Sequence, residues 1–225
     1  MKSFFIRAAV GLSLLASLVV VSAQTNSHNF VRWENEISTY ERSDATNPPP
    51  KGCFVFIGSS TIARWKTIAE DFPGVPVVNR GFGGSEIMDA THFAARVVVP
   101  YAPKKVFLRA GGNDLAAGKS AEEVFTNFTA FAETVHAALP SAEIIYISQS
   151  PSLARWKQHE AEKTLNTLAA AYVQEKPWMK YIETYDIVFG ADGMPRAELF
   201  VADKLHFNAE GYKLLAERVR PLLEQ

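Results

Sequence analysis

The stretch FVFIGSSTIARW, residues 54–65, decides the fold of this chain. It starts with four residues of the apolar, β-branched and aromatic kinds that form a buried strand, and then turns at Gly58 into Ser59 and Ser60. Comparable apolar stretches recur along the chain. The expected strands are residues 53–57, 75–79, 105–109, 143–148 and 180–185.

Segments of helical periodicity separate these expected strands. The clearest is 121–139, where Ser120 and Glu123 form a capping box ahead of regularly spaced apolar residues. Two more helices are expected at about 155–174 and 209–223. Helices of this length can cross back over a sheet between parallel strands, so the sequence predicts a three-layer α/β/α sandwich.

Polar motif residues follow the expected strands. Ser60 comes after the first strand, the glycine-rich turn 81–84 after the second, and Asn113 after the third. Asp203 lies three residues before His206, in the loop ahead of the last helix. Ligands of open α/β sheets bind beyond the carboxyl ends of the strands, so we expect these residues to share one crevice.

These residue types are the parts of an acyl-transfer site. A serine hydroxyl is a weak nucleophile, so Ser60 needs a base, and His206 is the histidine with an aspartate, Asp203, at a spacing that can orient it. Gly84 lets the backbone approach a tetrahedral intermediate, and Asn113 offers an amide donor. We therefore expect Ser60, Asp203 and His206 to be catalytic, with an oxyanion hole formed by Ser60, Gly84 and Asn113.

These motifs resemble those of the SGNH/GDSL hydrolase superfamily, and the resemblance covers about residues 54–212. By that resemblance Ser60 takes the place of the nucleophile, Gly84 and Asn113 those of the oxyanion donors, and Asp203 with His206 that of the DxxH pair. The resemblance also implies a flavodoxin-like sheet of five parallel strands in the order 2-1-3-4-5. The activity that it implies is that of a serine esterase without a cofactor.

Two positions depart from the family pattern. Ser59 stands where the first motif usually has aspartate, and Ser85 replaces an aspartate of many second motifs. The first replacement removes a brace beside the nucleophile and raises the question of which serine attacks; the position relative to Gly58 favours Ser60. The expected substrates are short-chain acetyl or carbohydrate esters. The alternatives are a lysophospholipase or thioesterase-type acylhydrolase and a non-catalytic carbohydrate-binding relative.

Arginine and aromatic residues occur in the loops expected to wall the crevice. Such side chains suit a sugar ring or a polar ester, although core packing is an equal alternative for Trp65. No extended groove for a long acyl chain is evident in the sequence. The candidate substrate-binding residues are Arg64, Trp65, Arg109, Arg155 and Trp156.

Composition and motif spacing exclude several other classes of function. The turn 81–84 fits neither a dinucleotide-binding nor a Walker pattern, and one motif histidine with scattered carboxylates is no metal ligand set. We expect no cofactor and no metal. The net charge is −1 and no basic run exceeds 104–105, which argues against nucleic acid as a partner. The expected partner is a small-molecule or carbohydrate ester, and the oligomeric state stays open.

The N-terminus has the pattern of a secretory signal peptide. Lys2 and Arg7 bracket a short charged region, an apolar run follows at 8–21, and small residues precede the expected cleavage after Ala23. The run is shorter than the roughly 20 residues that span a bilayer, so a retained anchor is the weaker alternative. We expect export to the periplasm or the medium. The expected divisions are a signal peptide (1–23), a helical arm with a proline-rich connector (24–52) and an SGNH hydrolase domain (53–225).

Overall fold

The computed structural model describes residues 28–223, so the predicted signal peptide lies outside the described residues. Five strands form one fully parallel sheet in the order β2-β1-β3-β4-β5. The strands are β1 (Phe54–Gly58), β2 (Val77–Gly81), β3 (Lys105–Arg109), β4 (Glu143–Ile147) and β5 (Met179–Ile182). The sheet confirms the predicted order 2-1-3-4-5.

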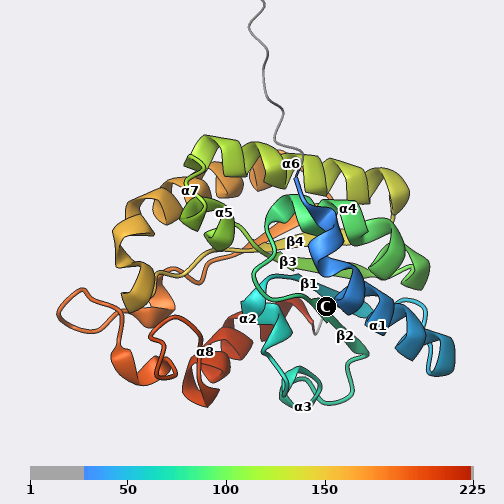
Figure 1. Ribbon diagram of the computed structural model, residues 1–225, viewed down its shortest axis with the longest axis horizontal. Coiled ribbons are helices and arrows are strands. Elements are labelled where there is room, and N and C mark those ends of the chain that lie inside the picture. The colour runs from blue at the N-terminus through green and yellow to red at the C-terminus, as the bar shows by residue number, and fades with distance from the viewer. Residues whose placement is uncertain (1–27, 224–225) are drawn as a thin grey trace, which may run out of the picture.

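Helices cover both faces of this sheet and complete the predicted three layers (Figure 1). The helices over one face are α1 (Glu34–Thr46), α4 (Ile87–Val97), α6 (Ala121–Ala138) and α7 (His159–Gln174). Those over the other face are α2 (Ser60–Ala63), α3 (Ile68–Asp71) and α8 (Ala209–Val219). The short α5 (Gly112–Ala116) follows β3. Short 3-10 segments are η1 (Phe30–Trp33), η2 (Val99–Tyr101), η3 (Leu153–Gln158), η4 (Asp186–Val188), η5 (Ala197–Leu199) and η6 (Arg220–Leu222).

The two hydrophobic cores follow from the alternation of side chains along each strand. Val55 and Ile57 belong to the core beneath α4, α6 and α7, whereas Phe54 and Phe56 belong to the core beneath α2, α3 and α8. All residues of β1 and β3 are buried, as expected of central parallel strands covered on both faces. The sheet is therefore a rigid platform for the loops at its carboxyl edge.

The capping box predicted at the start of α6 is present. Ser120 Oγ accepts the N–H of Glu123 at 3.2 Å, and the Glu123 carboxylate accepts the N–H of Ser120 at 2.7 Å. The predicted helical arm also forms, as η1 and α1, and it buries Trp33 and Ile37 in the core beneath α4, α6 and α7. Arg96 on α4 pairs with two α1 carboxylates and holds this arm in place.

Several predicted element boundaries differ from those of the structure, among them strand 75–79, which is β2 at Val77–Gly81, and helix 209–223, where α8 ends at Val219. For two further elements a contact with a distant part of the chain gives the reason. The strand expected at 180–185 ends at Ile182, because the N–H of Thr184 leaves the ladder and donates to Ser148 Oγ at 2.7 Å. The helix expected at 155–174 is interrupted: η3 has a non-helical residue at Arg155 (φ −120°, ψ 25°), and α7 starts only at His159. Side chains of η3 bond instead to the loop after β3.

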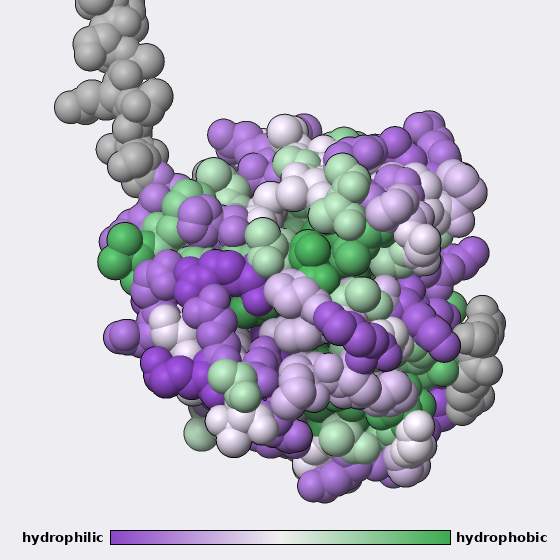
Figure 2. Space-filling view, turned by 90° about the vertical axis from the view of Figure 1, so that its right-hand side faces the viewer, coloured by the Kyte–Doolittle hydropathy of each residue, from purple (hydrophilic) through white to green (hydrophobic). Residues whose placement is uncertain are grey.

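Hydrophilic side chains cover much of the face drawn in Figure 2, with a hydrophobic group near its centre. Within residues 28–223, the helices are too short or too polar to cross a bilayer.

Candidate active site

The register of the sheet brings the motif residues to one edge. Gly58 lies beside Gly81 on one side and Arg109 on the other, so β1, β2 and β3 end together. Gly58 has a φ of 149°, and a Cβ there would collide with the carbonyl oxygen of Arg109. The chain can therefore turn sharply after β1 and start α2 at Ser60, where helical N–H groups have no partner within the helix.

Ser60, His206 and Asp203 form a continuous chain of hydrogen bonds. Ser60 Oγ lies 3.0 Å from His206 Nε2, and His206 Nδ1 lies 2.7 Å from Asp203 Oδ2. An ionised carboxylate can only accept, so the proton of a neutral imidazole is on Nδ1 and Nε2 is free to accept from the serine hydroxyl. The arrangement suits proton transfer from Ser60 to His206.

Asp203 also builds the turn that carries His206. Its Oδ1 accepts the N–H of Leu205 at 2.9 Å and that of His206 at 3.0 Å. The backbone N–H of His206, followed by its ring and the N–H of Leu205, holds the pKa of the Asp203 carboxyl well below its usual range. Asp203 is therefore ionised at neutral pH, and it fixes both the backbone and the ring of His206.

Asn113 reaches the same site from the start of α5. Its Nδ2 donates to the carbonyl oxygen of Ser85 at 2.9 Å, and its Oδ1 accepts from Arg155 Nη1 at 3.0 Å. Asn113 and Ser60 line one cavity. The asparagine amide thus connects the loop after β3 to the loop after β2, and it lies beside the serine.

The glycine-rich turn after β2 lies next to Ser60, but through Gly83 more directly than through Gly84. A Cβ on Gly83 would lie 3.9 Å from Ser60 Cβ, whereas one on Gly84 would meet Arg32 and Trp33 at 3.3 Å. Neither Gly83 nor Gly84 lines the cavity that holds Ser60, and the φ of +82° at Gly84 requires glycine. Of the predicted oxyanion residues, the structure brings Ser60 and Asn113 to one cavity, and Gly84 is not among the residues that line it.

The two serines that replace family aspartates occupy different surroundings. Ser85 is fully buried and donates from Oγ to the carbonyl oxygen of Gly58 at 3.4 Å, so a hydroxyl bridges the turns after β1 and β2. Ser59 N–H donates to the carbonyl oxygen of Arg109 at 3.1 Å, and the residue lines the cavity. Backbone bonds therefore hold the Ser59 turn in place.

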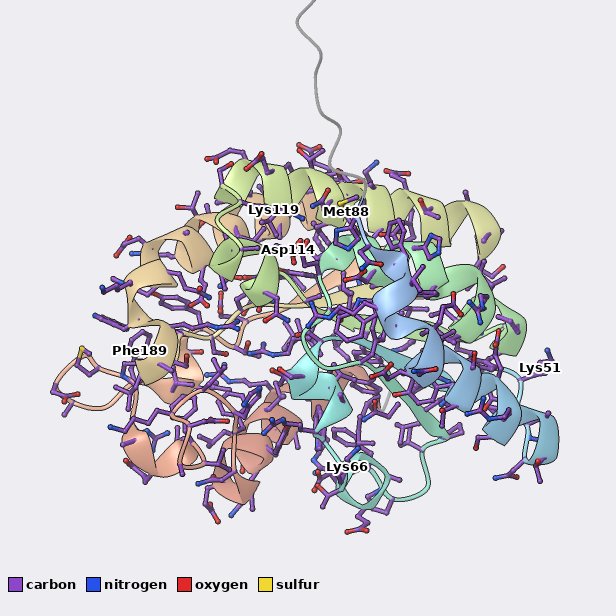
Figure 3. All side chains as sticks on the ribbon, in the orientation of Figure 1. Lys51, Lys66, Met88, Asp114, Lys119 and Phe189 are labelled. Carbon is purple, nitrogen blue, oxygen red and sulfur yellow. The ribbon has the colours of Figure 1, made fainter. Side chains whose placement is uncertain are left out.

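A buried carboxylate, Asp114, braces the loop next to Asn113. It accepts the N–H of Ile87 at 3.2 Å, and Lys119 Nζ lies 3.5 Å from it (Figure 3). Burial raises the pKa of Asp114 to about 6, against the opposing effect of Lys119. The hydrogen bond from Ile87 to Asp114 joins the start of α4 to α5. The loops after β2 and β3 are therefore fixed to each other through Asp114 as well as through Asn113.

The cavity beside Ser60 has a volume of about 50 Å³ and is lined mainly by polar side chains. Arg109 and Glu162 are almost fully buried there, and each has one polar atom without a hydrogen-bond partner among the described residues, Nε and Oε2 respectively. Burial lowers the pKa of Arg109 to about 10 and raises that of Glu162 to about 7. A larger groove of about 710 Å³ between α7 and β5 contains none of the motif residues.

The structure divides the predicted substrate-binding residues. Arg109 and Arg155 line the cavity, and Arg109 donates to Thr184 Oγ1 at 2.9 Å and Ser150 Oγ at 3.0 Å. The prediction for Trp65 was wrong: its side chain is fully buried between Phe56, Phe72 and Tyr212, as core packing requires.

Arg64 and Trp156 also lie outside the cavity. Arg64 Nη1 is 3.8 Å from Asp203 Oδ2, with both side chains about half exposed, so Arg64 lies behind the hydrogen-bonded chain. Trp156 stacks on His159 with ring centroids 3.9 Å apart and meets Phe189 edge-on. The structure therefore gives Trp156 aromatic partners of its own outside the cavity.

Several polar residues that line the cavity were not predicted from the sequence. They include Gln149, Gln158 and Glu162. Arg155, Gln158 and Glu162 recur at spacings of three and four, which places polar side chains on one face of a helical segment. That pattern at the carboxyl edge of the sheet was the available signal, and it looks the same as an ordinary solvated face until tertiary structure is known.

A bonded serine, histidine and aspartate at the carboxyl edge of a three-layer α/β sheet are typical of serine hydrolases. The chain belongs to the GDSL-like lipase/acylhydrolase family, whose family model matches residues 56–214. That match supports the hydrolase class and ester hydrolysis as the family's general chemistry. A search of the curated proteins found no match to this chain.

Solved structures share the fold across most of this chain. A Streptococcus pneumonia protein provisionally named a platelet activating factor has a TM-score of 0.75 and 22% identity, with 86% of this chain and 94% of that chain covered. A GDSL-like lipase from Bacteroides thetaiotaomicron has a TM-score of 0.68 and 21% identity, with 87% and 97% covered. A serine-to-alanine variant of an acetyl esterase, with acetate ion, has a TM-score of 0.59 and 18% identity, with 77% and 97% covered.

Proposed function

We propose that this chain is an exported serine esterase that hydrolyses short-chain carboxylic esters through an acyl-enzyme on Ser60. The observation that carries the proposal is the bonded chain from Ser60 Oγ through His206 to Asp203, at 3.0 and 2.7 Å. Family membership supports acyl hydrolysis as its class of reaction. The basis for export is the N-terminal signal pattern in the sequence.

The proposed acylation step moves one proton and exchanges one acyl bond. Ser60 Oγ attacks the ester carbonyl carbon while its proton passes to His206 Nε2, and Asp203 stabilises the imidazolium that forms. The tetrahedral intermediate then collapses, the bond to the alcohol oxygen breaks, and His206 returns the proton to the leaving alcohol. A water molecule, deprotonated by His206, releases the carboxylic acid by the reverse sequence.

The proposed oxyanion donors are the backbone N–H of Ser60, the amide of Asn113 and the backbone of the turn at Gly84. Asn113 lines the cavity with Ser60, and the N–H of Ser60 lies at the unpaired start of α2. Each donor would bond the oxygen as it gains charge, so each lowers the barrier more than it tightens substrate binding.

Cavity size and lining favour a short acyl group. One water molecule needs about 10–15 Å³ of cavity volume. A cavity of about 50 Å³ therefore has room for only a few atoms, as in an acetyl group. Most of its lining is polar, which does not favour a long alkyl chain. We therefore propose acetyl esters of small alcohols or carbohydrates, with the lysophospholipase or thioesterase type as the alternative.

Labelling with a fluorophosphonate tests the assignment of Ser60. The wild-type protein and Ser59→Ala should be phosphonylated, whereas Ser60→Ala should not, because only the side chain at 60 is bonded to His206. Ser59→Ala is the matched control for a neighbouring hydroxyl. An unlabelled but folded wild-type protein would favour the non-catalytic carbohydrate-binding alternative.

Acyl-chain length tests the substrate class. We expect kcat/KM on p-nitrophenyl esters to fall from acetate to octanoate, because the cavity beside Ser60 is too small to hold the longer chain. Acetylated sugars, acyl thioesters and lysophospholipids are compared in the same screen. A preference for the longer chains would support the acylhydrolase alternative.

A further inference from the structure

Arg155 lies at the break within η3, and its side chain reaches across to the loop after β3. One nitrogen, Nη1, donates to two acceptors, the carbonyl oxygen of Gly112 at 3.1 Å and Oδ1 of Asn113 at 3.0 Å. The backbone of Arg155 is not helical, with φ −120° and ψ 25°, at the point where its side chain makes these two contacts. The residue therefore contacts the amide proposed to bind the oxyanion.

The chemistry of arginine determines which way that amide points. A guanidinium has donors and no acceptor, so the Asn113 atom facing it must be the oxygen, Oδ1. The nitrogen, Nδ2, then faces the opposite way, and one of its two hydrogens bonds the carbonyl oxygen of Ser85 at 2.9 Å. The second hydrogen has no acceptor among residues 28–223, so it is available to a ligand in the cavity that Asn113 shares with Ser60.

Arg155 has a contact to Asn113 that its neighbour Gln158 does not duplicate. The carbonyl oxygen of Gly112 has a second donor, Gln158 Nε2 at 3.3 Å, so the loop keeps a bond to η3 without Arg155. Among the described residues, Arg155 is the donor recorded for Asn113 Oδ1. Removing the guanidinium would release the orientation of the amide while leaving part of the backbone contact.

The same 3-10 segment also contacts the turn that carries His206. The N–H of Ala154 donates to the carbonyl oxygen of Lys204 at 3.1 Å, between Asp203 and His206. The segment therefore joins the proposed proton-transfer side of the site to the proposed oxyanion side. Arg155, in the same segment, contacts the side chain of Asn113, the proposed amide donor to the oxyanion.

We propose that Arg155 is a positioning residue that holds the Asn113 amide with an N–H facing the oxyanion, a role that rests on the proposed function. The charge-assisted bond to Oδ1 also polarises the amide, which strengthens Nδ2 as a donor. Arg155 acts through Asn113, so its effect belongs to the transition state. A residue that bound substrate directly would change KM instead.

A double-mutant cycle tests this role on an acetyl ester. We expect Arg155→Ala to lower kcat about 10- to 100-fold with KM changed less than about 3-fold, because the donor is misoriented and not deleted. In the Asn113→Ala background, Arg155→Ala should cause no further loss. Lys157→Ala is the control: Lys157 is exposed on the same segment, and its removal should leave kcat unchanged.

Three results would overturn the proposal: multiplicative losses in the double variant, a selective rise in KM, or wild-type kcat in Arg155→Ala. If Arg155→Ala does not fold, Arg155→Lys replaces it in the same cycle. Arg155→Lys should lower kcat less than is expected of Arg155→Ala, and it should cause no further loss in the Asn113→Ala background. A further loss in that background would contradict the proposal. Ser60→Ala separates the two levels: substantial activity in that variant refutes the proposed function, whereas an inactive Ser60→Ala with multiplicative Arg155 and Asn113 effects refutes only the positioning role.

Discussion

Replacing Glu162 with glutamine should remove a pH-dependent loss of stability. Glu162 is 4% exposed on α7, its Oε1 accepts from Gln158 Nε2 at 2.8 Å, and its Oε2 has no partner among the described residues. Burial raises its pKa from 4.5 to about 7. Glutamine keeps the acceptor for Gln158 but cannot ionise, so Glu162→Gln isolates the cost of the buried charge.

The sign and size follow from proton linkage. Between pH 4.5 and 7 the folded state binds more protons at Glu162 than the unfolded state, so the group's contribution to stability is highest below 4.5 and is lost as the pH rises through 7. At about 1.4 kcal/mol per pKa unit, the shift corresponds to about 3 kcal/mol. The free energy of unfolding of Glu162→Gln minus that of the wild type should therefore grow by about 3 kcal/mol from pH 4.5 to pH 8.

Urea denaturation at several pH values, followed by circular dichroism, measures this difference. A constant offset between the proteins reports the new amide hydrogens, and only the change with pH tests the argument. Glu217→Gln on α8 is the control, since its side chain is exposed and its difference from wild type should stay flat. A flat difference for Glu162→Gln as well would refute the reasoning, because it would mean that Glu162 ionises as easily folded as unfolded.

Three further predictions concern the site and the core beneath it. Asn113→Ala should lower kcat by about 100- to 1,000-fold in steady-state ester hydrolysis, with KM little changed, because it deletes one proposed oxyanion donor; a selective rise in KM would contradict that role. Asp203→Asn should lower kcat by up to about 10,000-fold at neutral pH, since an amide no longer fixes the Nδ1–H tautomer of His206, and activity near that of wild type would exclude Asp203 as its orienter. Trp65→Ala should lower the free energy of unfolding by about 3–5 kcal/mol, measured by urea denaturation, because the ring is fully buried in the core. Its KM for acetyl esters should stay near the wild-type value, and a large rise would restore Trp65 as a substrate contact.

The sheet and most of its helices were predictable from local pattern. The apolar runs that became β1 and β3 are buried on both faces, and such strands read as continuous hydrophobic stretches without alternation. The capping box at Ser120 and Glu123 marked the start of α6 correctly, because both of its bonds lie within one turn of chain. The strand order came from the family resemblance, since periodicity carries no information on which strands are neighbours.

Elements whose ends depend on distant partners were predicted less well. β5 stops where Thr184 bonds Ser148, a contact across 36 positions, and α7 starts late because η3 reaches Gly112 across more than 40. Trp65 shows the same limit for side chains. A tryptophan after a strand has the same sequence context whether it faces a crevice or the core, and only packing against Phe56, Phe72 and Tyr212 decided its place.

The sequence by itself determined the α/β class and the candidate residues Ser60, Asn113, Asp203 and His206, because strand periodicity and motif chemistry are local properties of the chain. The Asp203–His206 bond was also local, since both residues belong to one turn. Only the tertiary structure decided that Ser60 meets an imidazole 146 positions away and that Arg155 holds the amide of Asn113. These contacts depend on strand register and on which helices cover which face, and both are set by the packing of the whole sheet.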